Sequence, residues 1–196
     1  MGNVNEIINK NAFPQNFQEQ RHILHTNENN CLNIKDIKKE IESIKLTSDI
    51  IYGWVSSLIQ LENMKIVTGC NDGSISINSI DLNKKEWKRI IYKENAHNDR
   101  VVSLCDLNDN RLVSGSDDKT IKVWNISMIE LNQIKIIKEH NDTIWKIIPL
   151  SNLTFASCSS DGSVRIWESI YNYQQLSILI HNDNVISILR LKGKIF

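Results

Sequence analysis

Large apolar residues recur at every third position in four short stretches of the chain, and similar distances separate these stretches. The first three are each followed by a strand-like run of small residues, a turn that contains aspartate, and a run in which apolar and polar residues alternate. A spacing of three favours a helix in an isolated segment, but the repeated context favours an extended strand. We therefore interpret each stretch as the first strand of a repeated β unit. The stretches are Val55, Leu58, Leu61; Val101, Leu104, Leu107; Ile144, Ile147, Leu150; and Val185, Ile188, Leu191.

Four residue types keep their phase in two of these units, 43 positions apart: His97 and His140, Ser114 and Ser157, Asp118 and Asp161, Trp124 and Trp167. A period of about 40–45 residues with four strands in each unit is typical of a β-propeller blade. The sequence thus predicts an all-β fold, a partial propeller. We expect four-stranded blades at about 50–94, 97–138 and 140–180, and a stub at 181–196 that supplies the first strand of a fourth blade.

At these residues the chain resembles the WD-repeat family, although Asn125 and Glu168 replace the aspartate of the name-giving pair. The resemblance implies that the four residues of each unit form a buried, hydrogen-bonded tetrad. Indole, hydroxyl, imidazole and carboxylate groups can be chained from donor to acceptor, so a sheet can bury them without orphaned polar atoms. The alternative from another class is a Ser-His-Asp hydrolase site. A catalytic constellation has no reason to recur one period later with a Trp attached, so we expect neither an enzyme nor a cofactor.

The tetrad is incomplete in the first unit and only begins in the last. Thr68 and Asp72 align with Ser114 and Asp118, but Ile51 stands at the His position and Asn78 at the Trp position. We therefore expect apolar packing alone to hold the first blade together. In the stub, His181 occupies the His position.

The turns between the second and third strands also differ among the units. Asp72-Gly73 and Asp161-Gly162 suit tight turns that need a positive φ, whereas the second unit has Asp118-Lys119 there, a locally poorer choice.

The resemblance also implies contact positions for partners on the rim of the central channel. In each unit these are the third and fifth residues after the His and the residue before the tetrad Asp. Trp54 and Trp145 are the most informative, because Trp is enriched at the centres of interfaces; the alternative for each is packing against the neighbouring blade. The positions are Trp54, Ser56, Asn71; Arg100, Val102, Asp117; Thr143, Trp145, Ser160; and Asn184, Ile186.

These features indicate a non-enzymatic interaction scaffold that binds a peptide or protein on the rim. A ubiquitin-ligase substrate receptor, or another subunit of a complex, is the alternative within the same class. Receptors of one cullin family carry an Arg where this chain has Ser127 and Ile170, so the resemblance fails at that residue.

Composition argues against other kinds of partner. Lys plus Arg and Asp plus Glu both number 23, so the formal net charge is zero, whereas nucleic-acid and membrane-surface proteins usually show a basic excess. Neither an apolar run of about 18 residues nor a hydrophobic signal core is present. The four cysteines lack CxxC spacing, which favours reduced thiols. We expect no metal, nucleic acid or membrane ligand and an intracellular location, in the cytoplasm or the nucleus.

Two segments precede the repeats. Residues 1–33 are rich in Asn and Gln and predict a disordered tail. In residues 34–47, Ile34, Ile37, Ile41 and Ile44 form one helical stripe, which predicts a short amphipathic helix. This helix packs on the propeller or stays half-formed, or it is a fragment of a dimerising coiled coil.

Three blades and a stub do not close a ring of about 4–8 blades. The chain is a piece of a longer protein, or copies or a partner complete the ring, or the arc stays open. The expected strand from Val185 to Leu191 has five large apolar residues and no further strand in its own blade. An exposed apolar edge pairs readily with other chains, so we expect association through the open ends.

Overall fold

The computed structural model describes residues 54–62, 64–81, 83–84, 86–151, 154–191 and 194–195. The expected tail at 1–33 and helix at 34–47 lie outside these residues. Three four-stranded antiparallel sheets account for most of the described part. Blade one contains β1 (Val55–Leu61), β2 (Lys65–Cys70), β3 (Ile75–Asp81) and β4 (Glu86–Lys93); blade two contains β5 (Val101–Asp106), β6 (Arg111–Ser116), β7 (Ile121–Ile126) and β8 (Leu131–Ile137); blade three contains β9 (Ile144–Ser151), β10 (Thr154–Ser159), β11 (Ser163–Glu168) and β12 (Gln175–Ile180).

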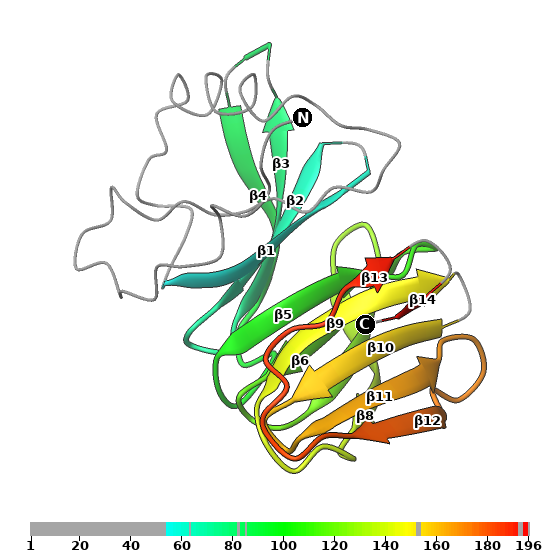
Figure 1. The fold of residues 1–196 in the computed structure, drawn as a ribbon. Helices are drawn as coiled ribbons and strands as arrows, with labels where there is room; N and C mark the ends of the chain where they lie inside the picture. The colour runs from blue at the N-terminus through cyan, green and yellow to red at the C-terminus, as the bar shows by residue number, and fades with distance from the viewer. Residues whose placement is uncertain are drawn as a thin grey trace, which may run out of the picture.

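Each blade is a meander in which neighbouring strands along the chain are neighbours in the sheet. The first strands, β1, β5 and β9, lie side by side in that order, and the sheets fan out from them (Figure 1). The expectation of an all-β partial propeller with three four-stranded blades is therefore confirmed. Alternating residues of each strand point to opposite faces of its sheet, so every blade can pack against two neighbours.

Two apolar cores fill the spaces between the blades. Between blades one and two, Val67 and Ile77 pack with Leu112 and Trp124. Between blades two and three, Val113 and Val123 pack with Phe155, Trp167 and other residues. Leu112 and Val113 are consecutive in β6 and serve different cores, as strand alternation requires.

Close approach between blades depends on small residues in the second strand. A Cβ atom at Gly115 would lie 2.6 Å from Cγ2 of Ile144, the first residue of β9. Gly69 stands in the same relation to Val101 of β5, where the distance would be 2.5 Å. The next residue in this series, 43 positions after Gly115, is Cys158, so blade three fills this position with a thiol.

Gly115→Ala should therefore lower the free energy of unfolding by about 1–3 kcal/mol, the usual effect of overpacking a core. The measurement is equilibrium urea unfolding followed by circular dichroism. The double variant Gly115→Ala/Ile144→Ala should lose less stability than the sum of the losses in the two single variants, because Ile144→Ala removes the methyl group that the new Cβ atom would clash with. Full additivity, or an unchanged stability of Gly115→Ala, would contradict close packing at this place.

The tight turns have the backbone geometry that their sequences indicated. Gly73 and Gly162 have φ values of 80° and 77°. Lys119 has a φ of 67° at the equivalent position of blade two, a conformation that is costly for a residue with a Cβ atom. In all three turns, a carboxylate oxygen of the preceding aspartate accepts the amide N–H two residues on, at 2.9 Å. This local hydrogen bond holds the turn in each blade.

The stub differs from its sequence-based prediction. Residues 184–189 form no strand, and β13 (Arg190–Leu191) pairs with β14 (Lys194–Ile195). The amide of Val185 donates to the carbonyl of Ser159 at 3.0 Å, and Ile188 is buried against Ala156, Cys158 and Val164. The segment meets side chains of blade three rather than a neighbouring strand, so no ladder forms. The prediction of a strand was therefore wrong for residues 184–189, whereas Ile186, Leu189 and Leu191 are exposed as expected.

Candidate functional site

A chain of hydrogen bonds crosses blade two from its core to its edge. The indole Nε1–H of Trp124 donates to Oγ of Ser114 at 2.8 Å. The same hydroxyl lies 2.7 Å from Nε2 of His97, and Nδ1 of His97 lies 2.9 Å from Oδ2 of Asp118. Because a carboxylate only accepts, His97 donates from Nδ1 and accepts the Ser114 hydroxyl proton at Nε2. Each shared proton therefore has one donor and one acceptor.

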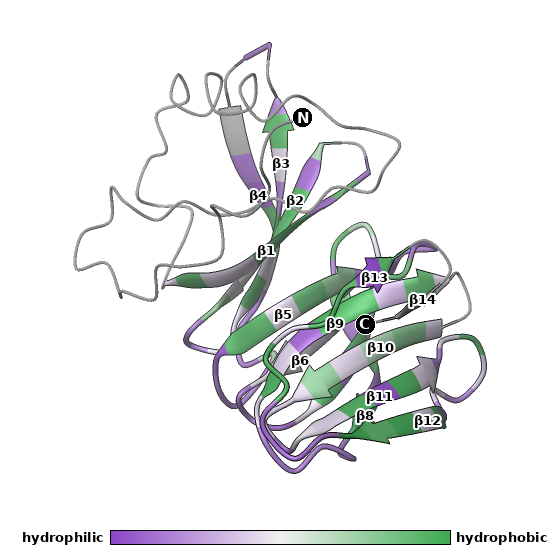
Figure 2. Cartoon of the chain, in the orientation of Figure 1, coloured by the Kyte–Doolittle hydropathy of each residue, from purple (hydrophilic) through white to green (hydrophobic). Residues whose placement is uncertain are grey.

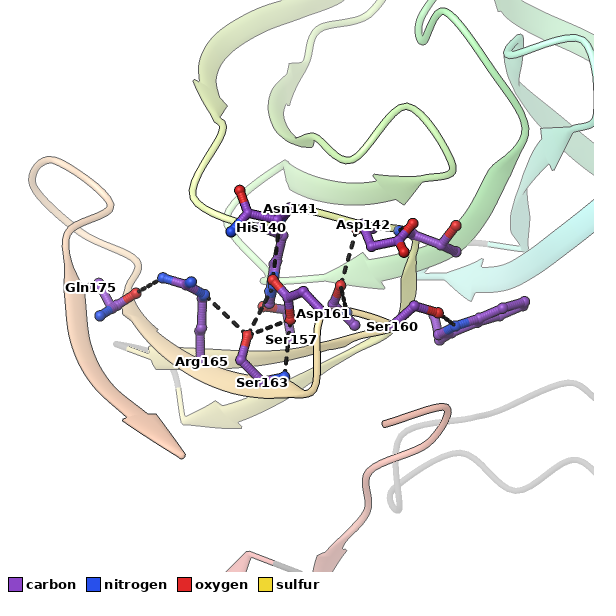
Figure 3. A network of polar contacts seen from close by, with 12 residues as sticks. His140, Asn141, Asp142, Ser157, Ser160, Asp161, Ser163, Arg165 and Gln175 are labelled. Carbon is purple, nitrogen blue, oxygen red and sulfur yellow. Dashed lines mark hydrogen bonds and ion pairs between the residues drawn. The ribbon is translucent and has the colours of Figure 1, made fainter. Parts of the chain in front are cut away.

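Blade three repeats this chain with His140, Ser157, Asp161 and Trp167. Figure 3 shows His140, Ser157 and Asp161 together. The three distances are again 2.9, 2.7 and 2.8 Å. Each aspartate is further held by the amide N–H of the residue after the histidine, at 3.0 Å. The loop that carries the histidine is thereby tied to the turn that carries the aspartate.

These Ser-His-Asp contacts have the spacing of a hydrolytic triad, but the serines are inaccessible. Ser114 and Ser157 are 0% exposed, and each hydroxyl already accepts an indole N–H. A nucleophile must reach its substrate, so this burial argues against the hydrolase alternative. The arrangement instead ties the histidine loop, the second and third strands and the aspartate turn of one blade together.

Burial decides the protonation states in both tetrads. Desolvation lowers the pKa of His97 and His140, and this effect outweighs the opposing attraction of Asp118 and Asp161. Burial by itself raises the pKa of each aspartate, but hydrogen bonds from the histidine, the following Thr120 or Ser163 and backbone amides hold it well below its usual range. Neutral histidines and ionised aspartates are therefore the stable forms near pH 7.

Blade one replaces the tetrad with a shorter polar chain. Oγ1 of Thr68 lies 2.8 Å from Oγ of Ser76, which accepts an N–H from Asn78 at 3.1 Å. Asn78 is 0% exposed, and its Oδ1 has no hydrogen-bond partner. The expectation that apolar packing alone holds this blade was therefore wrong. The sequence-based interpretation did not include Ser76 in this polar chain. The sequence did contain an indication of it, because Ser76 is a small polar residue two positions before Asn78 and so lies on the same, inward-facing side of the strand.

The predicted rim positions form a repeated backbone brace. In each blade the residue before the tetrad aspartate donates its amide to the third residue after the histidine position: Asn71 to Trp54, Asp117 to Arg100 and Ser160 to Thr143, at 2.8–3.1 Å. The structure thus brings these positions together in pairs on one edge of each blade.

Side chains link the rims of blades two and three. Nε of Arg100 donates to Oδ2 of Asp117 at 2.8 Å, and the guanidinium carbon lies 5.9 Å from the centre of the Trp145 ring. The Trp145 indole donates to Oγ of Ser160 at 2.6 Å. We call Arg100, Asp117, Trp145 and Ser160 the rim strip. An aromatic ring, a cation and a carboxylate lie in it, each partly exposed.

The remaining rim candidates vary in accessibility. Trp54 is 55% exposed, and Asn71 and Asn184 are also exposed. Val102 and Thr143 are half-buried, and the Ser56 hydroxyl donates to the Val101 carbonyl at 2.7 Å, an interblade contact. Trp145 also packs partly on the apolar cluster under the stub. Of the two tryptophans, only Trp54 is mainly exposed.

Other kinds of site have little support in the described residues. They contain no group of three or more His, Cys, Asp or Glu residues able to hold a metal ion. The cysteines among them, Cys70, Cys105 and Cys158, are free and buried, and burial raises the pKa of the Cys158 thiol to about 11. Within the same ranges, no helix has the length and apolarity to cross a membrane.

Comparison with known proteins identifies similar repeats. The WD domain, G-beta repeat model matches residues 88–125 and 131–168. Each match begins in or at the start of the outer strand of one blade and ends in the third strand of the next, so the sequence repeat is offset by one strand from the blade. The computed structure resembles a solved structure of U3-55K with a TM-score of 0.59 and 18% identity, over 68% of this chain and 42% of that one. This likeness shows the fold.

Several curated proteins are similar in sequence. The nuclear distribution protein nudF of Aspergillus flavus is 32% identical over 103 residues, which is 50% of this chain and 22% of nudF. The nuclear distribution protein PAC1 of Arthroderma otae is 34% identical over 82 residues, 40% of this chain and 17% of PAC1. The putative E3 ubiquitin-protein ligase LIN-1 of Lotus japonicus is 36% identical over 157 residues, 79% of this chain.

The chain thus spans about a fifth of the length of the nuclear distribution proteins and 10% of LIN-1. The matching repeats, the three meander blades and the fold likeness agree with one another. Proteins with these repeats are generally interaction scaffolds rather than enzymes. Residues 88–125 and 131–168 of this chain are therefore WD repeats.

Proposed function

We propose that this chain is a non-enzymatic scaffold segment that binds a peptide or protein on the rim of its blades. The observation that carries the proposal is the rim strip, in which Arg100 lies between Asp117 of its own blade and Trp145 of the next. Arginine and tryptophan dominate the energetics of protein interfaces. Their mutual contacts fix both side chains before binding, which lowers the entropy lost when a partner binds.

Trp54 extends this surface onto blade one. Its side chain is 55% exposed, and its carbonyl accepts the amide of Asn71, so the backbone that presents it is fixed. An exposed tryptophan on a fixed strand start can contribute apolar area to an interface at low entropic cost.

Trp54→Ala and Arg100→Ala should each reduce partner binding at least about ten-fold, equivalent to about 1.4 kcal/mol. Stability should change by only about 0.5 kcal/mol in Trp54→Ala, as is usual for exposed positions. Partners are recovered by proximity labelling with the parent chain and quantified by mass spectrometry, and the affinity of the main partner is then measured by calorimetry.

Tyr171→Ala is the matched control, because Tyr171 is 85% exposed and lies in the β11–β12 connection, away from the rim positions. It should recover the same partners as the parent chain. Equal recovery by all three variants would contradict the rim as the binding surface.

A second proposal places this scaffold in a ubiquitin ligase. The similarity to LIN-1 over 79% of this chain supports it. Against one form of it, Ser127 and Ile170 stand where receptors of one cullin family carry Arg. The proposal is supported if ubiquitin conjugates accumulate on the recovered partner in the presence of the parent chain but not of Trp54→Ala. It is contradicted if no conjugates form with either the parent chain or the variant.

We also propose an intracellular location, in the cytoplasm or nucleus. The support is the names of the similar nuclear distribution proteins.

A further inference from the structure

The outer strands of the three blades differ in charge. β4 carries Glu86, Lys88, Arg89 and Lys93, and β8 carries Lys135. β12 reads QLSILI, and residues 169–182 around it contain no Lys, Arg, Asp or Glu. Charged residues on an edge strand discourage pairing with another chain, so β12 lacks the protection that β4 and β8 have.

β12 is also the most apolar and the most exposed of the three. It lies at the end of its sheet and pairs with β11 alone in the described part of the chain. Figure 2 shows apolar residues along most of its length. Every residue of β12 is exposed, including Leu176 at 58%, Ile178 at 38%, Leu179 at 50% and Ile180 at 70%. An edge that is both unpaired and apolar favours the addition of a strand.

We propose that two copies of this chain pair through β12 in an antiparallel arrangement. Blade three of one copy and blade three of the other then form one continuous sheet. A neutral strand is compatible with itself, because antiparallel pairing sets no like charges opposite each other. A two-fold axis near Ile178 places Leu176 of one copy opposite Ile180 of the other, so exposed apolar side chains cover each other on the same face.

This surface is separate from the rim strip and from the stub. The rim strip lies on the loops and first strands, whereas β12 is the outermost strand of its blade. The stub buries Ile188 against blade three and does not offer an edge strand at 184–189. Association through β12 therefore leaves the proposed partner-binding surface free.

Sedimentation velocity of the 196-residue chain at tens of micromolar should show a dimer. Ile178→Lys should raise the dimer dissociation constant at least about ten-fold, because two lysines would then meet near the axis. Ile134→Lys is the matched control: Ile134 is 49% exposed on β8, the outer strand of blade two, and its variant should stay dimeric. Mixing Ile178→Lys with Ile178→Glu should restore a dimer, which also shows that both variants fold.

A monomeric parent chain would overturn the proposal. An Ile134→Lys variant whose dimer dissociates as readily as that of Ile178→Lys would also overturn it. A mixture of Ile178→Lys and Ile178→Glu that stays monomeric would overturn it as well. If the intact chain is monomeric and a variant without residues 1–46 dimerises, the N-terminal segment occupies the edge of β12. This outcome also rejects pairing between intact chains.

Discussion

Trp124→Ala should lower the free energy of unfolding by about 3–5 kcal/mol, the usual cost of emptying a large buried aromatic site. Trp124 is 1% exposed and packs in the core between blades one and two. Its removal also leaves the Ser114 hydroxyl without the indole donor. Equilibrium urea unfolding monitored by circular dichroism measures the loss. Marginal domains have about 5–15 kcal/mol in total, so this variant is expected to be close to unfolding.

Trp124→Phe separates packing from hydrogen bonding. It keeps most of the ring volume and removes the Nε1–H that donates to Ser114 at 2.8 Å. The lost hydrogen bond should lower the free energy of unfolding by about 1 kcal/mol relative to the parent chain. Tyr171→Ala, at an exposed position, should change stability by at most about 0.5 kcal/mol. A Trp124→Ala variant that unfolds like the parent chain but loses a hydrolytic activity would return the Ser-His-Asp interpretation to consideration.

Acidification should destabilise the fold in two steps. The pKa of His97 and His140 in the folded chain lies below the ordinary value of 6.5, mainly because burial disfavours the charged imidazole. At a pH between the lowered folded-state pKa and the ordinary value, the unfolded chain binds more protons than the folded chain. Stability therefore rises with pH in this range. The contribution is fully present above pH 6.5 and is lost as the pH falls through the folded-state values.

The tetrad aspartates act in the same direction at lower pH. The folded-state pKa of Asp118 and Asp161 lies below 3.8, so their contribution is present above that value and is lost as the pH falls further. Asp106 opposes this trend, because burial raises its folded-state pKa. Lys122 lies close enough to His97, and Arg165 to His140, to lower the histidine pKa further.

Urea unfolding from pH 8 to pH 3 measures the histidine step and the onset of the aspartate step. His97→Gln removes one titrating group, so its stability should be lower than that of the parent at pH 7 and should fall less between pH 7 and pH 5. A parent chain with equal stability at pH 7 and pH 5, or a His97→Gln variant with an undiminished fall, would contradict the assignment.

The repeated blades were predictable because their determinants are local and periodic. The aspartate turns, the alternating third strands and the 43-residue recurrence of four residue types each constrain a short segment, and all of them favour the same four-stranded unit. Lys119 shows how far this holds: the turn forms with a φ of 67° although the residue is a poor choice for it. The hydrogen bonds of the turn and of the blade outweigh the local cost.

Only the tertiary structure decided features that depend on contacts between segments far apart in the chain. The strand-like sequence from Val185 to Leu191 forms no strand at 184–189, because a strand needs a neighbour and this segment meets the side chains of blade three. The sequence indicated that the tetrad Trp had been replaced by Asn78 without any polar role, yet Asn78 joins Ser76 and Thr68 in a polar chain.

The rim shows the same division. The sequence alone placed Arg100 and Trp145 among the expected rim positions of successive units, as the third residue after one histidine and the fifth after the next. It could not show that the two side chains meet at 5.9 Å, since that distance depends on how one blade packs on the next. Residue identity and local turns are thus written in the sequence, whereas contacts between blades arise from long-range packing, which no short segment determines.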